Sequence, residues 1–407
     1  MRDVRMRGFS RRTGVDDALA ILAARTEALQ PETTPVGDAA GRVAAADIEA
    51  AFAVPHFVRS AMDGYALVAA STAGATEGAP ITLPIVGRAR PGRPFGGRVE
   101  VGQAVAVTTG APVPDGADAV LVAESTEATD DGRAVRVLAS VGPGKHVGAV
   151  GEDVAAGAVV VHRGRRLRPQ DVGLVASVGV ATLQVVRRPT VRVIVTGDEL
   201  LPPGSAPSGA RIVDSNSLVL RALAQRDGAA SVVVQYVVDD RAATRDALTS
   251  ATEDVLLVSG GSSVGPEDHA PLVLAEIGEL AVHGVALRPA GPAGFGFFDG
   301  RPVFLLPGNP VSCLCAYEFF AGPTLRALGG LPREWPHARV ACRAGAPIGG
   351  DVGRTDYVRV RLEGGFAHPL AAGASILSST TRADGAVVVG PERAGYAEGD
   401  AVTVVLY

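Results

Sequence analysis

The 407-residue sequence predicts a multidomain subunit with a doubly wound central α/β domain and smaller β-rich domains. Between residues 190 and 330, apolar strand-like runs alternate with helical stretches, as in a parallel sheet that is covered on both faces. On both sides of this region, short Val- and Ile-rich runs are separated by Gly, Pro and Asp, as in small β-domains. The length favours several domains because one ordinary core does not need so many residues.

The N-terminal part is predicted to contain a helix, a β-rich module and a second helix. Residues 14–30 carry apolar side chains at helical spacing, with Asp16 and Asp17 in the first turn. Residues 168–179 have the same helical character, and Pro169 lies in the first turn. Between these helices, strands are expected at 80–87, 104–110, 118–125 and 134–141.

The central region is predicted to alternate strands and helices as far as residue 330. Ser215 is expected to cap the first helix and Gly228 to end it. The strands are expected at 190–197, 231–238, 254–261 and 301–310, and the helices at 215–228, 240–252, 267–278 and 310–330. From about residue 335 the β character returns, with strands at 337–345, 354–364, 386–392 and 400–407. This last part is predicted to be a small barrel or sandwich.

Composition and charge argue against several classes of protein. The net charge of -5 gives no indication of a nucleic-acid partner. No apolar run approaches the ~18 residues of a membrane helix, and no signal-peptide segment follows the N-terminal arginines. The three cysteines, Cys313, Cys315 and Cys342, are too few for a disulfide framework and fit a reducing compartment. We therefore expect a cytoplasmic protein without a membrane or nucleic-acid partner.

Polar or glycine-rich loops are expected after the strands of the α/β domain. Because such loops follow the carboxyl ends of parallel strands, they should meet at one edge of the sheet. Glycines let the backbone approach a ligand, and free backbone N–H groups and hydroxyls bind phosphate. The pattern therefore favours a ligand that carries phosphate. The loops are Thr196–Leu200, Val238–Asp240, Gly260–Gly265 and Pro307–Pro310.

Carboxylates gather in the same loops, at Asp198, Glu199, Asp239, Asp240, Glu267 and Asp268. Acidic side chains repel a bound anion unless a cation lies between them, so the sequence predicts Mg²⁺ at this edge. A structural role is the alternative, because Asp198 and Asp268 are placed to cap helices. The same alternative holds for Asp239 and Asp240, and the residues alone leave it open.

Two further polar loops lie outside the α/β region. Residues 60–66 (SAMDGYA) place Asp63 beside a glycine, and Thr108–Pro112 end a predicted strand with two hydroxyls and a glycine. Taken separately, each loop is equally consistent with a satisfied turn.

The complete set of loops resembles the molybdopterin molybdenumtransferase family, of the MoeA and gephyrin E-domain type. SAMDGYA and the stretch at 108–120 (TTGAPVPDGADAV) are the most specific of the matching segments. The glycine-rich and PGNP loops are less specific, because molybdopterin adenylyltransferases use a similar α/β domain. The segments occur in family order, at 60–66, 108–120, 151–153, 196–200, 214–216, 259–268 and 306–312.

The resemblance implies four domains and an elongated homodimer. In this sequence the domains correspond to 14–56 with 154–186, a small β domain at 57–153, the α/β domain at 187–332, and a C-terminal β-barrel-like domain at 333–407. The N-terminal helix is expected to pack on the α/β domain. The active site would form between the α/β domain of one subunit and the β domains of the other.

The resemblance also implies the reaction. Adenylylated molybdopterin and molybdate would give molybdenum cofactor and AMP, with Mg²⁺ as the cation. The polar residues of the cleft, taken as catalytic, would be Asp63, Thr109, Asp153, Glu199, Asp239 and Asp268, of which Glu199, Asp239 and Asp268 would hold the metal. The substrate-binding residues would be Gly260, Gly261, Ser263, Gly265, Arg288, Pro307, Gly308, Asn309, Pro310, Arg354 and Ser378. Molybdopterin adenylyltransferase and apo-molybdoenzymes are the further partners that it implies.

The sequence departs from the family pattern at three places. The family typically carries a KPGKP stretch for molybdate, but this chain has Arg288 at the first position and Gly291 at the second lysine. An arginine keeps the charge, although it is not equivalent to lysine, whereas the glycine removes the charge. Residues 146–150 replace an arginine-rich run, and Ser262 replaces a valine.

Three functions are therefore weighed. An active molybdenum insertase is favoured. A catalytically reduced paralogue that acts as a pterin-binding or scaffold protein, or an insertase for another oxyanion such as tungstate, is the alternative. The retained acids Asp63, Glu199, Asp239 and Asp268 argue against a pure scaffold. An adenylyltransferase would account only for residues 190–330.

Overall fold

A computed structural model describes residues 12–262, 265, 268–370 and 373–407 of the chain. The chain divides into two compact units, and each is described by itself. The core unit comprises the residues up to Glu32 together with Val186–Tyr407, and the inserted unit comprises Thr33–Val185. Among the described residues, no helix has the length and apolar character needed to cross a membrane.

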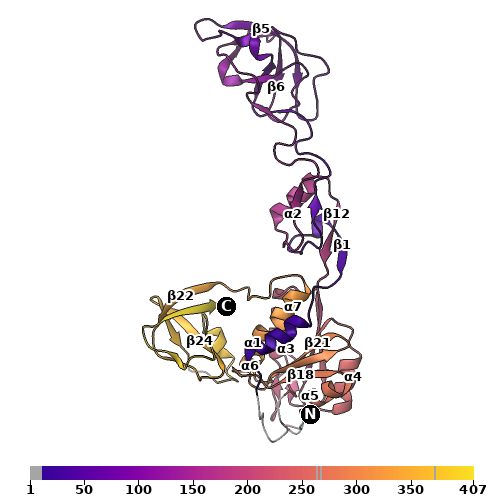
Figure 1. Ribbon diagram of the computed structural model, residues 1–407, viewed down its shortest axis with the longest axis vertical. Helices are drawn as coiled ribbons and strands as arrows, with labels where there is room; N and C mark the ends of the chain where they lie inside the picture. Colours follow the sequence, from indigo (N-terminus) through magenta and orange to yellow (C-terminus); the bar gives the residue numbers. More distant parts are fainter. Residues whose placement is uncertain (1–11, 263–264, 266–267, 371–372) are drawn as a thin grey trace. The chain divides into compact units, whose positions relative to one another are not determined.

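The core unit contains a six-stranded sheet with the strand order β16-β13-β17-β21-β20-β18. The first four strands run parallel, and β20 and β18 are antiparallel to their neighbours. Helices α3 (Asn216–Arg226), α4 (Arg241–Thr249) and α5 (Ala270–Ile277) connect or follow the parallel strands (Figure 1). The strands are β13 (Thr190–Thr196), β16 (Ser231–Val237), β17 (Val255–Ser259), β18 (Glu279–His283), β20 (Gly294–Phe298) and β21 (Arg301–Leu306).

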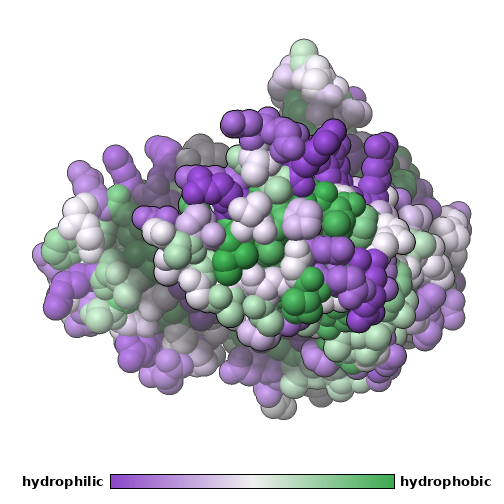
Figure 2. Space-filling model, turned by 90° about the horizontal axis from the view of Figure 1, so that it is seen from above, coloured by the Kyte–Doolittle hydropathy of each residue, from purple (hydrophilic) through white to green (hydrophobic). Residues whose placement is uncertain are grey.

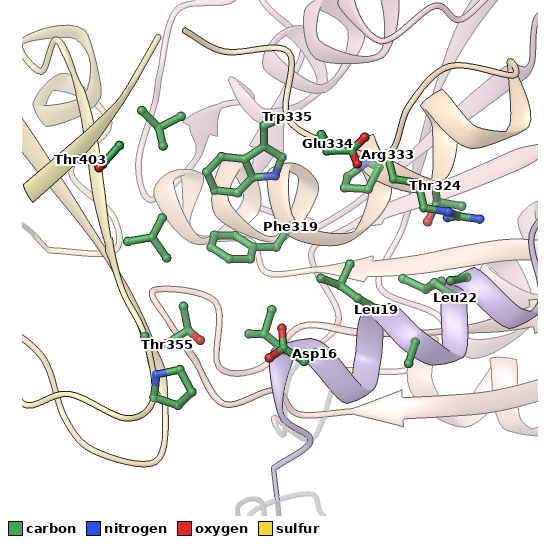
Figure 3. Close-up of a pocket in the computed structure, with 18 of the residues that line it drawn as sticks. Asp16, Leu19, Leu22, Phe319, Thr324, Arg333, Glu334, Trp335, Thr355 and Thr403 are labelled. Carbon is green, nitrogen blue, oxygen red and sulfur yellow. The ribbon is translucent and has the colours of Figure 1, made fainter. Parts of the chain in front are cut away.

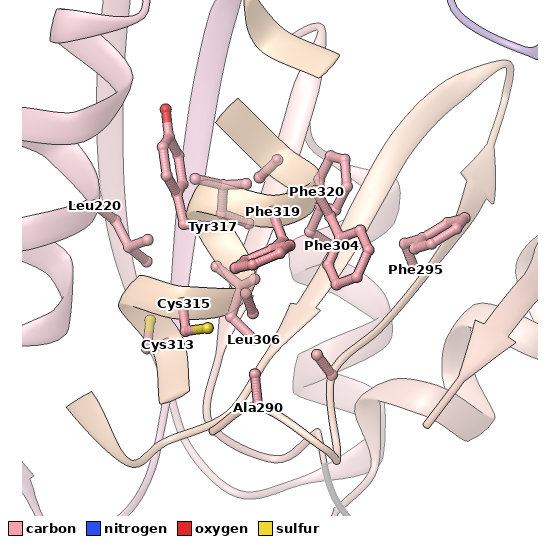
Figure 4. Packing of buried hydrophobic residues seen from close by; sticks show 14 of the residues in the cluster. Leu220, Ala290, Phe295, Phe304, Leu306, Cys313, Cys315, Tyr317, Phe319 and Phe320 are labelled. Atoms are coloured by element: carbon pink, nitrogen blue, oxygen red, sulfur yellow. The ribbon is translucent and has the colours of Figure 1, made fainter. Parts of the chain in front are cut away.

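Both faces of this sheet are buried, as the apolar strands predict. Along β17, Leu257 belongs to one apolar cluster, whereas its neighbours Leu256 and Val258 belong to another. The first cluster also holds the rings of Phe295 and Phe304, whose centroids lie 6.1 Å apart (Figure 4). The predicted doubly wound α/β domain is therefore confirmed.

The two antiparallel strands are not among the predicted strands. The segment of β20 reads GFGFF, and its two glycines make it look like a turn. The glycine is needed at Gly296, because a Cβ there would overlap the backbone oxygen of Glu279 in β18. The sheet therefore continues past its parallel part through two antiparallel strands, and the backbones of β20 and β18 are in very close contact.

Two helices differ from the prediction. Residues 310–330 form α6 (Pro310–Ala316), a π-helical turn (Tyr317–Ala321) and α7 (Gly322–Leu328), because Pro323 has no N–H to continue the α-helical ladder. Helix α1 (Val15–Ala24) ends earlier than predicted. The segment after α1 contacts the end of α7, where the backbone N–H of Leu29 donates to the carbonyl of Leu328 at 2.8 Å.

The C-terminal part of the core unit is a small β-barrel. Its sheet has the order β19-β24-β25-β22-β28-β26, and an additional pairing of β24 with β26 closes it. Strand β19 (Leu287–Arg288) comes from the α/β part and pairs parallel with β24 (Thr355–Glu363). The remaining strands are β22 (Arg339–Ala344), β25 (Phe366–Pro369), β26 (Gly385–Val389) and β28 (Ala401–Leu406). The barrel is thereby joined to the loop that follows β18.

The inserted unit contains a six-stranded sheet and helix α2 (Pro169–Ser177). The sheet has the order β7-β4-β6-β5-β9-β8, and Leu67, Leu83 and Leu121 lie in its core. The strands are β4 (Gly64–Leu67), β5 (Ile81–Ala89), β6 (Ala104–Val107), β7 (Ala119–Val122), β8 (Thr126–Ala128) and β9 (Ala134–Val137). On the face of the molecule in Figure 2, small groups of apolar residues lie among hydrophilic ones, which is ordinary for a protein surface.

Candidate functional site

The loops after the four parallel strands meet at one edge of the sheet, as predicted. They surround a cavity of about 340 Å³, here called the acidic cavity. Asn216 joins two of these loops, because its amide donates to Ser259 Oγ at 3.0 Å and to the carbonyl of Gly308 at 2.9 Å. The cavity is lined by Thr196, Gly197, Glu199, Asp239, Gly260, Gly261, Ser262, Asp268, Pro292, Pro307, Gly308 and Asn309.

Glycine is required where the loop after β17 passes the end of β13. Gly260 has a φ of 91°, and a Cβ there would lie 2.4 Å from the carbonyl oxygen of Thr196. The hydroxyl of Thr196 lies against the glycines of this loop, and among the described residues it has no hydrogen-bond partner, although Thr196 is buried. Within the described part of the chain, the wall of the cavity thus contains an unsatisfied polar group.

The carboxylates of the acidic cavity repel one another. The N–H of Asp198 donates to the carboxylate of Asp239 at 3.1 Å, and the N–H of Asp239 donates to the carboxylate of Asp198 at 3.2 Å. Burial raises the pKa of Asp239, and the negative charges of Asp198 and Glu199 add to this rise. Asp240, in contrast, caps α4 by accepting from the N–H of Ala243 at 2.9 Å. Of this adjacent pair, Asp240 has the structural role and Asp239 lines the cavity.

The two other capping alternatives do not hold. Asp198 precedes the short strand β14 (Leu200–Leu201) rather than a helix, and the residue that caps α5 is His269. Asp268 instead accepts a short hydrogen bond from the N–H of Gly265. Among the described residues, no three or more carboxylate, imidazole or thiol groups are already arranged to hold a metal ion. Metal binding by Glu199, Asp239 and Asp268 therefore stays a prediction.

A second cavity, of about 660 Å³, adjoins the acidic cavity and is lined by arginines. It is here called the arginine cavity. Pro292, Pro307 and Asn309 line both cavities, so the two spaces meet at these residues. Four arginines line the second space: Arg12, Arg288, Arg354 and Arg359. A cavity lined by carboxylates and a cavity lined by arginines are thus adjacent to each other.

Three of these arginines are held in place by neighbours. Nε of Arg288 lies 2.7 Å from Asp356, and Nε of Arg354 lies 3.2 Å from the same carboxylate. Arg359 is only 3% exposed and has no carboxylate partner among the described residues. It donates to Ser379 Oγ at 2.5 Å, and its Nε has no hydrogen-bond partner among the residues that the structure describes. Burial lowers the pKa of Arg359, which is the cost of keeping a cation there.

The other predicted substrate-binding residues of the core unit have different positions. Pro310 is the first residue of α6, directly after Asn309. Ser378 is exposed at the start of α8 (Ser378–Thr381) and is not among the described residues that line the arginine cavity. Its neighbour Ser379 contacts Arg359 instead. Ser263 lies outside the described residues, as does Glu267.

Three predicted catalytic residues belong to the inserted unit. Asp63 accepts hydrogen bonds from the N–H and the hydroxyl of Thr109, at 2.7 and 3.2 Å, so the SAMDGYA and TTGAP loops are in direct contact. Asp153 is exposed, and its N–H donates to the carbonyl of Val54 at 3.1 Å. The predicted set is therefore divided between the two units.

Sequence reasoning missed Arg12, Asp356 and Arg359. Asp356 and Arg359 lie in a strand of alternating pattern, where nothing local separates a buried charge from an exposed one. Arg12 approaches the cavity only through tertiary contact. Cys313 and Cys315 are buried in α6, and burial raises the pKa of Cys313 to about 12.

A third cavity in the core unit, of about 800 Å³, has a mainly apolar wall. Figure 3 shows Leu19 and Leu22 of α1 on one side and Trp335 and Phe319 on another. The rings of Phe319 and Trp335 are in edge contact, with centroids 4.8 Å apart. Among the described residues that line it, none belongs to the glycine-rich loops that follow the parallel strands.

Comparison with known proteins gives matches along nearly the whole chain. Three family models match in order: the MoeA N-terminal region (domain I and II) at residues 13–179, a probable molybdopterin binding domain at 192–327, and the MoeA C-terminal region (domain IV) at 341–407.

Individual relatives agree with these models. The molybdopterin molybdenumtransferase 2 of Mycobacterium tuberculosis is 38% identical, over 79% of this chain and 82% of its own. The molybdopterin molybdenumtransferase of Haemophilus influenzae is 30% identical, over 92% and 93%. The crystal structure of a molybdopterin biosynthesis MoeA protein from Pyrococcus superimposes with a TM-score of 0.84 at 32% identity, covering 97% of this chain and 99% of that one.

Proposed function

The chain belongs to the molybdopterin molybdenumtransferase family, and we propose that it inserts molybdenum from molybdate into adenylylated molybdopterin with release of AMP. The observation that carries this proposal is the shared wall of the two cavities at Pro292, Pro307 and Asn309. A reaction between a phosphoanhydride and an oxyanion needs one place for a phosphate with its cation and an adjacent place for the oxyanion. The acidic and arginine cavities provide two such places side by side.

The arginine cavity is suited to a tetrahedral dianion. Guanidinium groups bind oxyanions through paired, charge-assisted hydrogen bonds, and three such groups are positioned by neighbouring side chains. The unpartnered Nε of the buried Arg359 is a donor without an acceptor in the described part of the chain. An anion in the cavity would remove the cost of burying this charge.

The glycine loops are suited to the pterin phosphate. At Gly260 and Gly261, positive φ angles bring the backbone close to Thr196 and leave no side chain between it and a ligand. Gly308 and Asn309 complete this side of the acidic cavity, and the Asn216 amide fixes their loop.

Mg²⁺ fits the acidic cavity. Glu199, Asp239 and Asp268 would hold it. Burial raises the pKa of Asp239, and the neighbouring negative charges, which a cation would compensate, raise it further. The missing three-ligand cluster is compatible with Mg²⁺, which commonly binds one or two carboxylates, water and substrate phosphate. When bound, the ion would neutralise the charge that develops as the phosphoanhydride breaks.

Titration with molybdate tests the proposal. Purified chain, adenylylated molybdopterin and Mg²⁺ would be mixed with increasing molybdate, and AMP release and reconstitution of an apo-molybdoenzyme would be measured. We expect molybdate-dependent AMP release that Asp268→Ala abolishes and Asp246→Ala leaves unchanged. Asp246 is a suitable control because it is an exposed carboxylate on α4, away from the residues that line the cavity.

The same titration separates the alternatives. Pterin binding without AMP release, even at high molybdate, would replace the insertase with a pterin-binding or scaffold protein. The missing charge at Gly291 is the feature that favours an altered oxyanion, so tungstate would be titrated in parallel. A much lower half-saturating concentration of tungstate than of molybdate would identify a tungstate insertase.

A homodimer is part of the proposal, as the family resemblance implies. Asp63→Ala and Asp268→Ala would each be inactive because each removes one predicted catalytic carboxylate. If one active site uses residues of both subunits, mixing and reassembling the two inactive proteins would restore about a quarter of the sites. No recovery in mixed dimers would assign all of these residues to one subunit.

A further inference from the structure

The backbone beside Arg12 is fixed against the loop that carries Gly291. Thr13 forms a parallel bridge with Val285, and its N–H donates to the carbonyl of Gly284 at 3.0 Å. On the other side, the N–H of Ala286 donates to the carbonyl of Thr13 at 2.8 Å. The N–H of Val285 in turn donates to the carbonyl of Gly291 at 3.0 Å. Arg12 is therefore held next to this loop by main-chain hydrogen bonds.

The guanidinium of Arg12 lies where a side chain at position 291 would begin. A Cβ built on Gly291 would be 3.5 Å from Cζ of Arg12 and 3.6 and 3.7 Å from its two terminal nitrogens. These are ordinary contact distances, and Gly291 does not have a left-handed φ. The position therefore accepts a side chain sterically, and a cation from elsewhere in the chain now lies beside it.

Arg12 also differs from the other arginines of the cavity in its partners. Arg288 and Arg354 share the carboxylate of Asp356, whereas within the described residues no carboxylate pairs with Arg12. Its side chain is exposed to the cavity, so its charge is available to a ligand. The buried Arg359, whose Nε has no partner in the described part of the chain, independently indicates that this cavity accepts an anion.

We propose that Arg12 binds the oxyanion substrate and supplies the positive charge that residue 291 lacks. The inference rests on the proposed function for the identity of the oxyanion as molybdate. Arg12 would determine how much molybdate is needed, and the carboxylates of the acidic cavity would be unaffected. The N-terminal segment thus contributes to the site of the α/β and barrel parts of the core unit.

Molybdate alone is the first probe. Calorimetric titration of the full chain with molybdate should give a dissociation constant that Arg12→Ala raises about tenfold, the effect of one charge-assisted contact. Arg221→Ala is the matched control, because Arg221 is an exposed arginine of α3 and its removal changes the net charge equally. Its dissociation constant should equal that of the wild type.

Rescue at position 291 is the second part of the experiment. Arg12→Ala/Gly291→Lys should restore the affinity to within about threefold of the wild type, because the new ammonium would enter the space that Arg12 leaves. In the AMP-release assay, Arg12→Ala should raise the half-saturating molybdate by the same factor and leave the saturating rate within about twofold. If Arg12 had only a structural role, Arg12→Ala would lower the thermal stability, and Gly291→Lys would not restore the affinity for molybdate.

The outcomes separate this inference from the proposed function. If the wild type releases no AMP but binds molybdate, the proposed function fails, and the calorimetric comparison still decides the role of Arg12. If the wild type turns over and Arg12→Ala has unchanged affinity and unchanged half-saturating molybdate, only the role of Arg12 is overturned. A wild-type chain that binds no molybdate and releases no AMP overturns both.

Discussion

Nε of Arg288 lies 2.7 Å from Oδ1 of Asp356, and the two residues are also paired in the register of β19 with β24. The contact joins the loop of the α/β part to the barrel at the arginine cavity. Asp356 is only 1% exposed and also accepts from Nε of Arg354 and from the N–H of Asp351. One buried carboxylate therefore organises two of the cationic side chains that face the proposed oxyanion.

Replacing Asp356 should cost much more stability than replacing Arg288. Asp356→Asn removes the buried negative charge that pairs with two arginines. We therefore expect the free energy of unfolding to fall by about 2–4 kcal/mol. Arg288→Gln should cost less than about 1 kcal/mol, because the Arg288 side chain is 57% exposed and Arg354 still pairs with the carboxylate. Urea unfolding of both variants checks this. Equal losses would mean that Asp356 has no organising role.

Replacing Asp239 should separate stability from activity. Burial and the charges of Asp198 and Glu199 raise the pKa of Asp239, so its ionised form is disfavoured in the folded protein. A group of this kind reduces stability as the pH rises through its unfolded pKa of about 4. Asp239→Asn should therefore have an equal or higher Tm at pH 7, and the gap should close below pH ~4. Its AMP release should fall at least about a hundredfold. A lower Tm in calorimetry would contradict this.

Much of the fold could be predicted from the sequence because its apolar pattern is strong. The buried strands of the parallel sheet and the helices between them follow from apolar periodicity alone. The sequence-based prediction was wrong where contacts or breaks of the backbone determine the structure. The GFGFF segment pairs with β18 because Gly296 permits a close approach, and Pro323 interrupts a helix that its apolar residues would continue.

The site was predictable where it follows from topology. Parallel strands end at one edge, so Glu199, Asp239 and the glycine loops could be expected to meet there. The arginine cavity could not be predicted in the same way. Asp356 and Arg359 become recognisable only once burial is known, and Arg12 reaches Gly291 across a separation of more than 270 residues that leaves no local pattern.

Breaking the buried ion pairs around Asp227 should strongly destabilise the core unit. Asp227 accepts from Arg326 at 2.7 Å, from Arg226 at 2.8 Å and from the Tyr317 hydroxyl at 3.0 Å, and it is 1% exposed. Asp227→Ala leaves the buried Arg326 without its counter-ion, so we expect a loss of about 3–5 kcal/mol in urea unfolding.

Two further variants make this prediction specific. Glu279→Ala breaks the exposed pair with Arg25 and should cost less than about 1 kcal/mol. Asp227→Leu/Arg326→Met removes both buried charges and should recover part of the loss, since an apolar pair needs no counter-ion. A double variant that is less stable than Asp227→Ala would show that the hydrogen bonds, and not the unpaired charge, determine the cost.

Asp171 should give helix α2 a stability that depends on pH. Its carboxylate accepts from the N–H of Arg168 at 2.9 Å at the start of the helix, and hydrogen bonds from the side chains of Arg168 and Arg165 hold its pKa well below the ordinary value. A lowered pKa stabilises the folded form above the unfolded pKa of about 4, and this contribution declines as the pH falls below it.

Asp171→Asn should therefore weaken α2 by about 1 kcal/mol at pH 7, as expected for the loss of a charged helix cap. Hydrogen–deuterium exchange of a peptide that covers α2 measures this change locally, within the inserted unit. The difference in protection between wild type and variant should shrink steadily below pH ~4. Glu127→Gln serves as the control, because Glu127 forms an exposed pair with Arg136 in the same unit. A difference that stays constant down to pH ~3 would show that the charge of Asp171 is not what stabilises the helix.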